Sequence, residues 1–140
     1  MITIEHIEDY WTTLTREYTE NRMSPQLAAA YAAWIAADSA REGRIADHNQ
    51  MVAHEFRGAL RSNNWPINEA SELSIPRACV RHALSIVFFE LRKDMGIAQT
   101  ESENIAATRA DVFLRNVWTG NAKASLVYRE QTPTFKGANQ

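Results

Sequence analysis

The chain has 140 residues, a length that suits one domain with a core large enough to need no disulfide or metal. Fifteen basic and seventeen acidic side chains give a net charge of −2, which argues against general electrostatic capture of nucleic acid or of an acidic membrane surface. Five glycines and four prolines are few, so the composition favours helices over a turn-rich β architecture.

The single cysteine, Cys79, excludes an intramolecular disulfide, and its place in an apolar helix predicts a small buried side chain rather than a nucleophile. The N-terminus carries acidic residues early and has no apolar core of a signal peptide. No apolar run approaches the ~20 residues that a membrane span requires. We therefore expect a soluble chain made in a cytoplasm.

The first expected helix covers about four turns near the N-terminus, with Thr3 as its cap and Asn21 near its end. Its apolar residues follow steps of three and four: Ile4, Ile7, Trp11, Leu14 and Tyr18. Ser24 and Pro25 then predict a new start, with serine as the cap and proline in the first turn. The apolar face of this second, alanine-rich helix consists of Leu27, Tyr31, Trp34 and Ile35.

Residues 37–43 are ambiguous, because charged side chains interrupt the apolar stripe there. We expect either a break near residues 39–43 or one long helix that is partly exposed. The pattern resumes at Arg44 and ends at Asn63 and Asn64, followed by a Trp-Pro-Ile turn at 65–67 and a short polar linker. The predicted apolar residues of this helix are Ile45, Val52, Phe56 and Leu60, with Met51 and Ala59 beside them.

The most apolar stretch is 75–96, which predicts the central core helix of the fold. Pro76 fits its first turn and Gly96 fits its end. One stripe of this helix consists of Val80, Leu84, Val87, Phe88, Leu91 and Met95, and further apolar residues beside the stripe predict that other helices cover it on more than one side.

The last expected helix opens with a capping box formed by Thr100 and Glu103, and Gly120 fits the position just after its end. Its predicted apolar face consists of Ile105, Val112, Phe113, Leu114, Val117 and Trp118. Residues 127–140 show no periodicity and contain Pro133 and Gly137. The sequence thus predicts an all-α bundle of four to five helices around a central buried helix at about 75–95. A helical domain at 1–126 is followed by an extended C-terminal arm at 127–140.

The sequence shows no constellation that indicates catalysis, a cofactor or a metal. His48 and His54 are six residues apart and fall on different helix faces, and no zinc or calcium motif occurs. His48 and Glu55 share a face of the helix, and such a pair is usually a solvated ion pair rather than a metal site. His82 borders the core helix and suits a hydrogen-bonded boundary position. We expect no enzyme.

Two groups of residues are candidates for contact with a partner. Gln50, His54, Arg57 and Arg61 form a polar, partly basic stripe, which suits either plain solvent exposure or contact with another protein or a polyanion. In the C-terminal arm, Val127, Tyr128 and Phe135 are the only apolar anchors, with Arg129 and Lys136 beside them. Four tryptophans are spread over the helical regions, which favours an assembly in which neighbouring chains cover part of the aromatic surface.

From Arg44 onward, several motifs occur in a specific order. They are the helix I-A-D-x-x-x-x-V-A-x-x-F-R-G-A-L at 45–60, the W-P-I turn at 65–67, the helix start I-P-R-x-C-V-R-x-A-L at 75–84, a Glu-rich helix opening at 101–103, and the ending F-L-R-N-V-W-T-G-N-A-K-A-S-L at 113–126. In this order they resemble the small helical head–tail connector (adaptor, or head-completion) proteins of tailed bacteriophages, especially the Mu-like prophage group. The resemblance covers roughly 80 of the 140 residues. Residues 1–43 and the arm have no counterpart in it, and Asn121 and Ala122 interrupt the family's usual G-K-A-S-L ending.

The resemblance implies a structural protein of the virion neck, assembled in the host bacterial cytoplasm. Such proteins form a ring, usually of twelve copies, between the portal protein at the capsid vertex and the next neck or tail-completion protein. Genome DNA passes through the ring without specific binding, and no membrane is involved. The alternative is a small helical regulatory or DNA-binding adaptor from a mobile element, which would need a basic recognition helix; the stripe at 50–61 is the only candidate for one.

Overall fold

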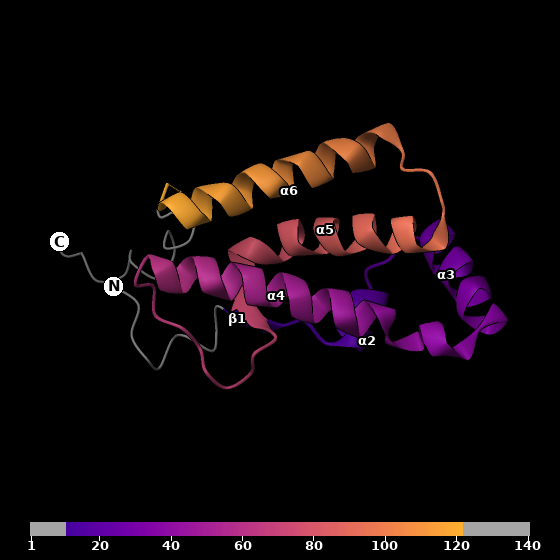
Figure 1. Cartoon of the computed structure of the whole chain (residues 1–140), viewed down its shortest axis with the longest axis horizontal. Helices are drawn as coiled ribbons and strands as arrows, with labels where there is room; N and C mark the ends of the chain where they lie inside the picture. Colours follow the sequence, from indigo (N-terminus) through magenta and orange to yellow (C-terminus); the bar gives the residue numbers. More distant parts are fainter. Residues whose placement is uncertain (1–10, 122–140) are drawn as a thin grey trace.

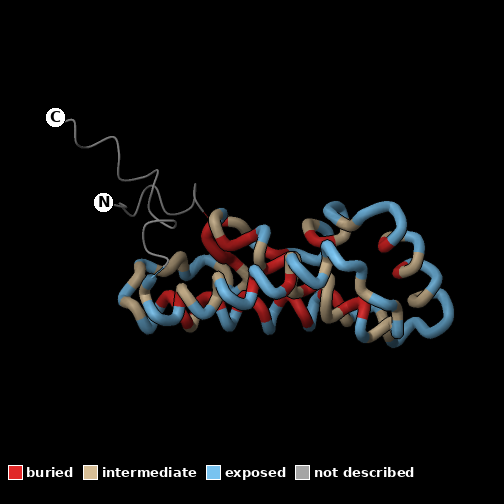
Figure 2. The backbone as a smooth tube through the Cα atoms, turned by 90° about the horizontal axis from the view of Figure 1, so that it is seen from above, coloured by how far each residue is buried: buried red, intermediate tan, exposed pale blue. Residues whose placement is uncertain are grey.

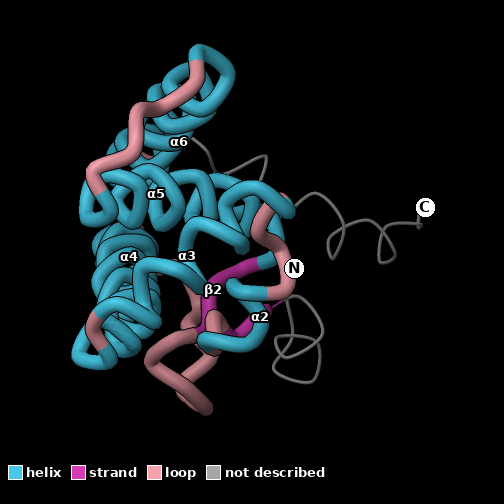
Figure 3. Tube along the Cα trace, turned by 90° about the vertical axis from the view of Figure 1, so that its right-hand side faces the viewer, coloured by secondary structure: helices cyan, strands magenta, loops and turns pink. Residues whose placement is uncertain are grey.

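The computed structural model describes residues 11–121, which fold as an all-α bundle with one small sheet. Three long helices make up most of it: α4 (Arg44–Ser62), α5 (Arg77–Met95) and α6 (Glu101–Thr119). In Figures 1 and 3, α5 lies between α4 and α6, and it packs against both. This arrangement confirms the predicted bundle around a central helix. The predicted arm at 127–140 lies outside the described residues.

The central helix begins two residues later than its predicted start at Ile75. Pro76 belongs to a short strand and precedes the first residue of α5, whereas the sequence suggested a place in the first turn. Gly96 ends the helix as predicted, with a φ of +70° that suits glycine. Cys79, Ala83, Val87 and Leu91 are buried, but Phe88 and Phe89 stay half-buried. The other helices therefore cover α5 incompletely.

A two-stranded antiparallel sheet replaces part of the helix expected near the N-terminus. Strand β1 (Trp11–Thr13) pairs with β2 (Ser74–Pro76), with Trp11 opposite Pro76 and Thr13 opposite Ser74. The prediction of one helix through Tyr18 is thus wrong over residues 11–15, while Ile4 and Ile7 lie outside the described residues.

Two local features explain the difference. Thr12 and Thr13 are β-branched and suit a strand, and β2 supplies the partner for their backbone groups. Thr15 then accepts a hydrogen bond from the backbone N–H of Tyr18 and begins α2 (Arg16–Glu20). Trp11 and Leu14 are buried all the same, so an apolar spacing that suits a helix arises here from a strand and a turn.

The second expected helix is present as α3 (Pro25–Ala37), capped by Ser24 with proline in its first turn, as predicted. After it, the chain forms a 3₁₀ helix, η2 (Ser39–Gly43), so the predicted break occurs and the alternative of one long helix is wrong. The Asp38 side chain starts η2 by accepting a hydrogen bond from the backbone N–H of Ala40.

Two apolar clusters stabilise the fold. The larger one joins α4, α5, the sheet and the end of α6, and its fully buried members include Leu14, Phe56, Leu60 and Ile75. The smaller one joins α3, α4 and the end of α5 through Tyr31, Ile45 and Leu91. Figure 2 shows the buried residues along the inner sides of the helices, while the outer sides are exposed.

Helix α6 has the predicted ends but a different inner face. Thr100 and Glu103 form the capping box, and Gly120, at a φ of +84°, ends the helix. Ala107, Ala110 and Val117 are buried, whereas Ile105, Val112 and Trp118 are 45%, 43% and 48% exposed, so the apolar face predicted for this helix is wrong at these three positions. Alanine brings the backbone of α6 close to α5, and this contact orients the larger residues outward.

Candidate partner-binding surfaces

The polar stripe predicted on α4 lies beside the loop that connects α4 to β2. Helix and loop together enclose a shallow groove of about 550 Å³, which we call the α4 groove. It is lined by Asp47, Gln50, Met51, His54, Arg57, Arg61, Glu69 and Glu72. All four residues of the predicted stripe are therefore in one place, but the loop adds carboxylates that periodicity along the helix does not show.

Arg57 differs from the other residues of the stripe, because its side chain is buried and only 2% of the residue is exposed. Its Nη1 donates to the carbonyl oxygens of Asn68, at 2.9 Å, and Ser74, at 3.0 Å. Its Nη2 donates to Oε1 of Glu69 at 3.2 Å. Arg57 thus holds the connecting loop and the start of β2 against α4.

The charges of the α4 groove are mixed. Burial lowers the pKa of Arg57, the nearby charge of Arg61 lowers it further, and Glu69 and Glu72 oppose this effect. Arg61 is half exposed and reaches Oε1 of Glu69 at 3.4 Å. Because carboxylates compensate both arginines, the groove lacks the excess of positive charge that binds a nucleic-acid backbone.

A second exposed surface is the outer side of α6. Ile105 and Val112 are seven residues apart, so they lie on the same side of the helix, at the centre of its exposed face. Arg109 lies between them and is also exposed. These two exposed apolar side chains make the outer side of α6 a candidate surface for contact with another molecule.

Trp118 lies near the end of α6, where α6 and α4 converge. It is 48% exposed, and its ring lies over Gly58, whose added Cβ would be 3.6 Å from the ring. The side chain of Asn63 joins the two helices there by donating to the carbonyl oxygens of Val117, at 2.7 Å, and Trp118, at 3.1 Å. The backbone at Trp118 is therefore joined to α4, while about half of the residue remains exposed.

Instead of the expected ion pair with Glu55, His48 makes a hydrogen bond to another carboxylate. His48 is buried, and its Nε2 lies 2.6 Å from Oδ2 of Asp94 on α5. Arg44 donates to the same carboxylate from Nε, at 3.1 Å, and from Nη2, at 3.2 Å. Burial raises the pKa of Asp94, but the hydrogen bonds from Arg44 and His48 outweigh it and hold the pKa below its usual value. The cluster joins the start of α4 to the end of α5.

The remaining chemically reactive residues are in structural positions. Cys79 is fully buried, as predicted, and burial raises its pKa so far that the thiol stays protonated. The ring of His82 stacks on Phe113 with 4.2 Å between the ring centroids, and within residues 11–121 it does not make the expected hydrogen bond. Burial and the charge of Arg81 lower the pKa of His82.

Over residues 11–121, no group of three or more His, Cys, Asp and Glu side chains is placed to hold a metal ion. None of the helices in this part of the chain is long and apolar enough to cross a membrane. The predicted anchors of the arm lie outside the described residues and stay predictions: Val127, Tyr128, Arg129, Phe135 and Lys136.

The chain has no match among known family models, curated proteins or solved structures.

Proposed function

We propose that the chain is a structural connector subunit of the neck of a tailed bacteriophage. In this proposal, copies of the chain form a ring between the portal protein and the next neck or tail-completion protein. The ring assembles in the bacterial cytoplasm and remains part of the virion. The observation that carries the proposal is that one subunit presents two different exposed surfaces, the outer side of α6 and the α4 groove.

A ring needs two such surfaces, because each subunit contacts its neighbours head to tail through patches that differ and complement each other. In Figures 1 and 3, α6 and the loop that borders the α4 groove lie on opposite sides of the helical layer. The α6 side offers Ile105 and Val112 with a cation between them, and the α4 groove offers Met51, which is 47% exposed, among carboxylates. Apolar contact and opposite charge both favour their pairing.

The resemblance in sequence supports the same proposal from a different direction. Its W-P-I motif at 65–67 begins the loop beside the α4 groove, and its I-P-R motif at 75–77 connects β2 to α5. The arm at 127–140, with Tyr128 and Phe135 as anchors, is proposed to bind the portal protein. The ordering of an arm on its partner costs conformational entropy, which the apolar contacts offset.

The charges favour a channel wall over a DNA-binding protein. The chain carries a net charge of −2, which suits a lumen through which DNA passes without specific binding. The alternative of a DNA-binding adaptor loses its candidate recognition helix, since Arg57 is buried and Glu69 lies within reach of both Arg57 and Arg61. The connector is therefore the function that the molecule supports best.

The subunit interface is tested by the substitution Val112→Asp on α6. The new carboxylate would have to lose its water in an apolar contact, so we expect the ring to dissociate into single chains while the fold is retained. Native mass spectrometry reports the assembly, and circular dichroism reports the fold.

Asn104→Asp is the matched control, because it adds the same charge to α6 away from the face that holds Ile105 and Val112. We expect this variant to assemble like the unmodified chain. An unchanged ring in the Val112→Asp variant would exclude the outer side of α6 as the subunit interface.

A further inference from the structure

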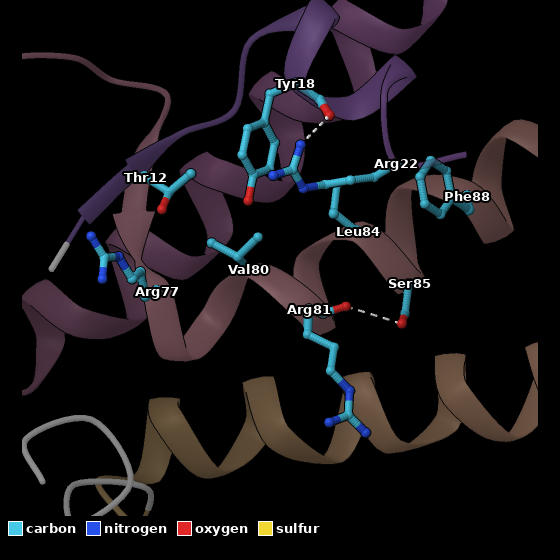
Figure 4. A pocket seen from close by; sticks show the side chains of 9 residues that line it. All are labelled: Thr12, Tyr18, Arg22, Arg77, Val80, Arg81, Leu84, Ser85 and Phe88. Atoms are coloured by element: carbon cyan, nitrogen blue, oxygen red, sulfur yellow. Dashed lines mark hydrogen bonds between the residues drawn. The ribbon is translucent and has the colours of Figure 1, made fainter. Parts of the chain in front are cut away.

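A third surface, which we call the α5 groove, lies on the side of α5 that the other helices leave open. Its volume is about 710 Å³, and Val80, Leu84 and Phe88, spaced four residues apart, form its floor (Figure 4). Tyr18 and Arg22 form the opposite wall. A further hollow of about 240 Å³ shares Arg22, Ser85 and Phe88 with it and extends the surface towards α6.

The floor of this groove belongs to the most apolar helix of the chain. The stripe that packs α5 into the core continues into the groove at Phe88, and Phe89 lines the adjoining hollow; both residues are only half-buried. A helix with apolar residues on several sides needs a cover on each of them. Among the described residues, Val80 and Leu84 are already covered, at 7% and 8% exposed, whereas Phe88 is half-buried, so the apolar surface that a ligand could still cover lies around Phe88.

Three arginines at the α5 groove make it strongly basic. Arg22, Arg77 and Arg81 line it, and none of them forms a salt bridge with another residue in the range 11–121. Arg22 lies over the ring of Tyr18, with 3.5 Å from its guanidinium carbon to the ring centroid. Arg92, in the adjoining hollow, is compensated by Glu103 at 2.7 Å. The ligand of the groove should therefore combine apolar side chains with about three acidic ones.

The first ten residues of the chain have this composition. They read MITIEHIEDY, with the apolar residues Ile2, Ile4 and Ile7 and the acidic residues Glu5, Glu8 and Asp9. The C-terminal residues 122–140 contain three basic side chains and one acidic side chain, and their charge opposes binding to the same groove.

Residues 1–10 are also joined to the fold at Trp11, close to the groove. The ladder of the sheet ends at the pair of Trp11 and Pro76, immediately before α5 begins at Arg77, and Thr12 itself lines the groove. From Arg77 to Phe88, α5 rises about 16 Å, whereas ten residues span up to about 33 Å when extended. The segment can therefore reach the whole floor. A ligand attached to its own site also has a high effective concentration.

We propose that residues 1–10 bind the α5 groove of the same chain. The isoleucines cover the apolar surface around Phe88, and the three carboxylates pair with Arg22, Arg77 and Arg81. The segment completes the apolar cover of α5 and keeps other acidic, apolar peptides out of the groove. This contact is independent of the ring and would exist in a single chain.

Paramagnetic broadening in the full-length chain tests the proposal. A nitroxide is attached to the variant His6→Cys, in which Cys79→Ala removes the native thiol. We expect the amide signals of Ser85 and Phe88 to lose most of their intensity, while those of Arg109 and Val112, on the outer side of α6, keep theirs. Equal intensity at both places would overturn the proposal.

Charge reversal makes the test specific. In the first variant, glutamate replaces Arg22, Arg77 and Arg81, and we expect the broadening at Ser85 to disappear. In the second variant, arginine also replaces Glu5, Glu8 and Asp9, and we expect the broadening to return. Broadening that survives the first set of substitutions, or that the second set fails to restore, contradicts the charge pairing. A mixture of spin-labelled and isotope-labelled chains should show no broadening, since broadening there would place the segment in another copy.

Discussion

At the scale of single residues, Arg57 determines the shape of the surface beside α4. Its guanidinium is the buried donor for two carbonyl oxygens of the connecting segment, at Asn68 and Ser74. A buried carbonyl without a donor loses its hydrogen bond to water and gains nothing in return. Arg57 therefore helps to hold the segment 68–74 against α4.

We predict that Arg57→Met lowers the free energy of unfolding by about 2 kcal/mol or more, because methionine retains the apolar stem but leaves these carbonyls without their donor. Urea denaturation followed by circular dichroism measures the change.

Arg61→Met is the control, since Arg61 also reaches Glu69 but is half exposed. An exposed ion pair contributes little, and we expect a change within about 0.5 kcal/mol. Equal losses in the two variants would show that the burial of Arg57 has no special effect on stability.

Local chemistry makes some residues predictable from sequence and others not. Ser24, Thr100, Gly96 and Gly120 are at helix ends as expected, since the hydrogen bonds and backbone angles of a cap depend on a few neighbouring residues. Arg57 was expected on a solvated stripe. The sequence clue to its burial is that it follows the buried Phe56 by one residue and precedes the buried Leu60 by three. The acceptors that make its burial tolerable come from residues 68–74, whose position the sequence of α4 does not encode.

At the scale of elements, the packing of α6 depends on its last turn. Asn63, at the end of α4, donates to two carbonyl oxygens of α6, and Gly120 ends α6 beside it. A Cβ at Gly120 would lie 2.8 Å from Oδ1 of Asn63, closer than two such atoms can approach. The two helices therefore need glycine at this position for space as well as for its backbone angle.

We predict that Gly120→Ala destabilises the fold by about 2 kcal/mol, from the left-handed backbone angle and from displacement of the Asn63 side chain. The midpoint of thermal unfolding should fall accordingly.

Gly43→Ala provides the comparison, since that glycine has a φ of −81° and no atom within 4 Å of an added Cβ. We expect it to leave stability unchanged or to raise it slightly, because alanine restricts the unfolded chain. A Gly120→Ala variant as stable as Gly43→Ala would contradict the close approach of Asn63 and Gly120.

The long helices were predictable because their apolar period extends over many turns and their caps agree with it. Strand β1 was not, because Trp11, Leu14 and Tyr18 are spaced as in a helix, and only the distant segment Ser74–Pro76 supplies the pairing that makes a strand favourable. The inner face of α6 was also misassigned, since Ala107 and Ala110 carry less hydrophobic signal than Ile105 and Val112 but fit a closer contact with α5.

At the scale of the whole molecule, the proposed connector depends on exposed surfaces more than on the core. The sequence located the α4 stripe, but the acidic loop that forms the other wall of the α4 groove joins it only in the fold. The outward apolar residues of α6 and the basic α5 groove were likewise not predictable from the sequence, because periodicity assigns apolar residues to the core by default. Candidate binding surfaces therefore emerge from differences between the predicted and the observed burial.

The mass of the assembly under native conditions tests the proposed function most directly. The chain has a mass of 15.9 kDa, and the measurement is made on the chain alone and after mixing with the portal protein of the same phage. We predict a complex that contains one copy of the chain for each portal subunit. A chain that remains a monomer and binds no portal protein would contradict the connector function.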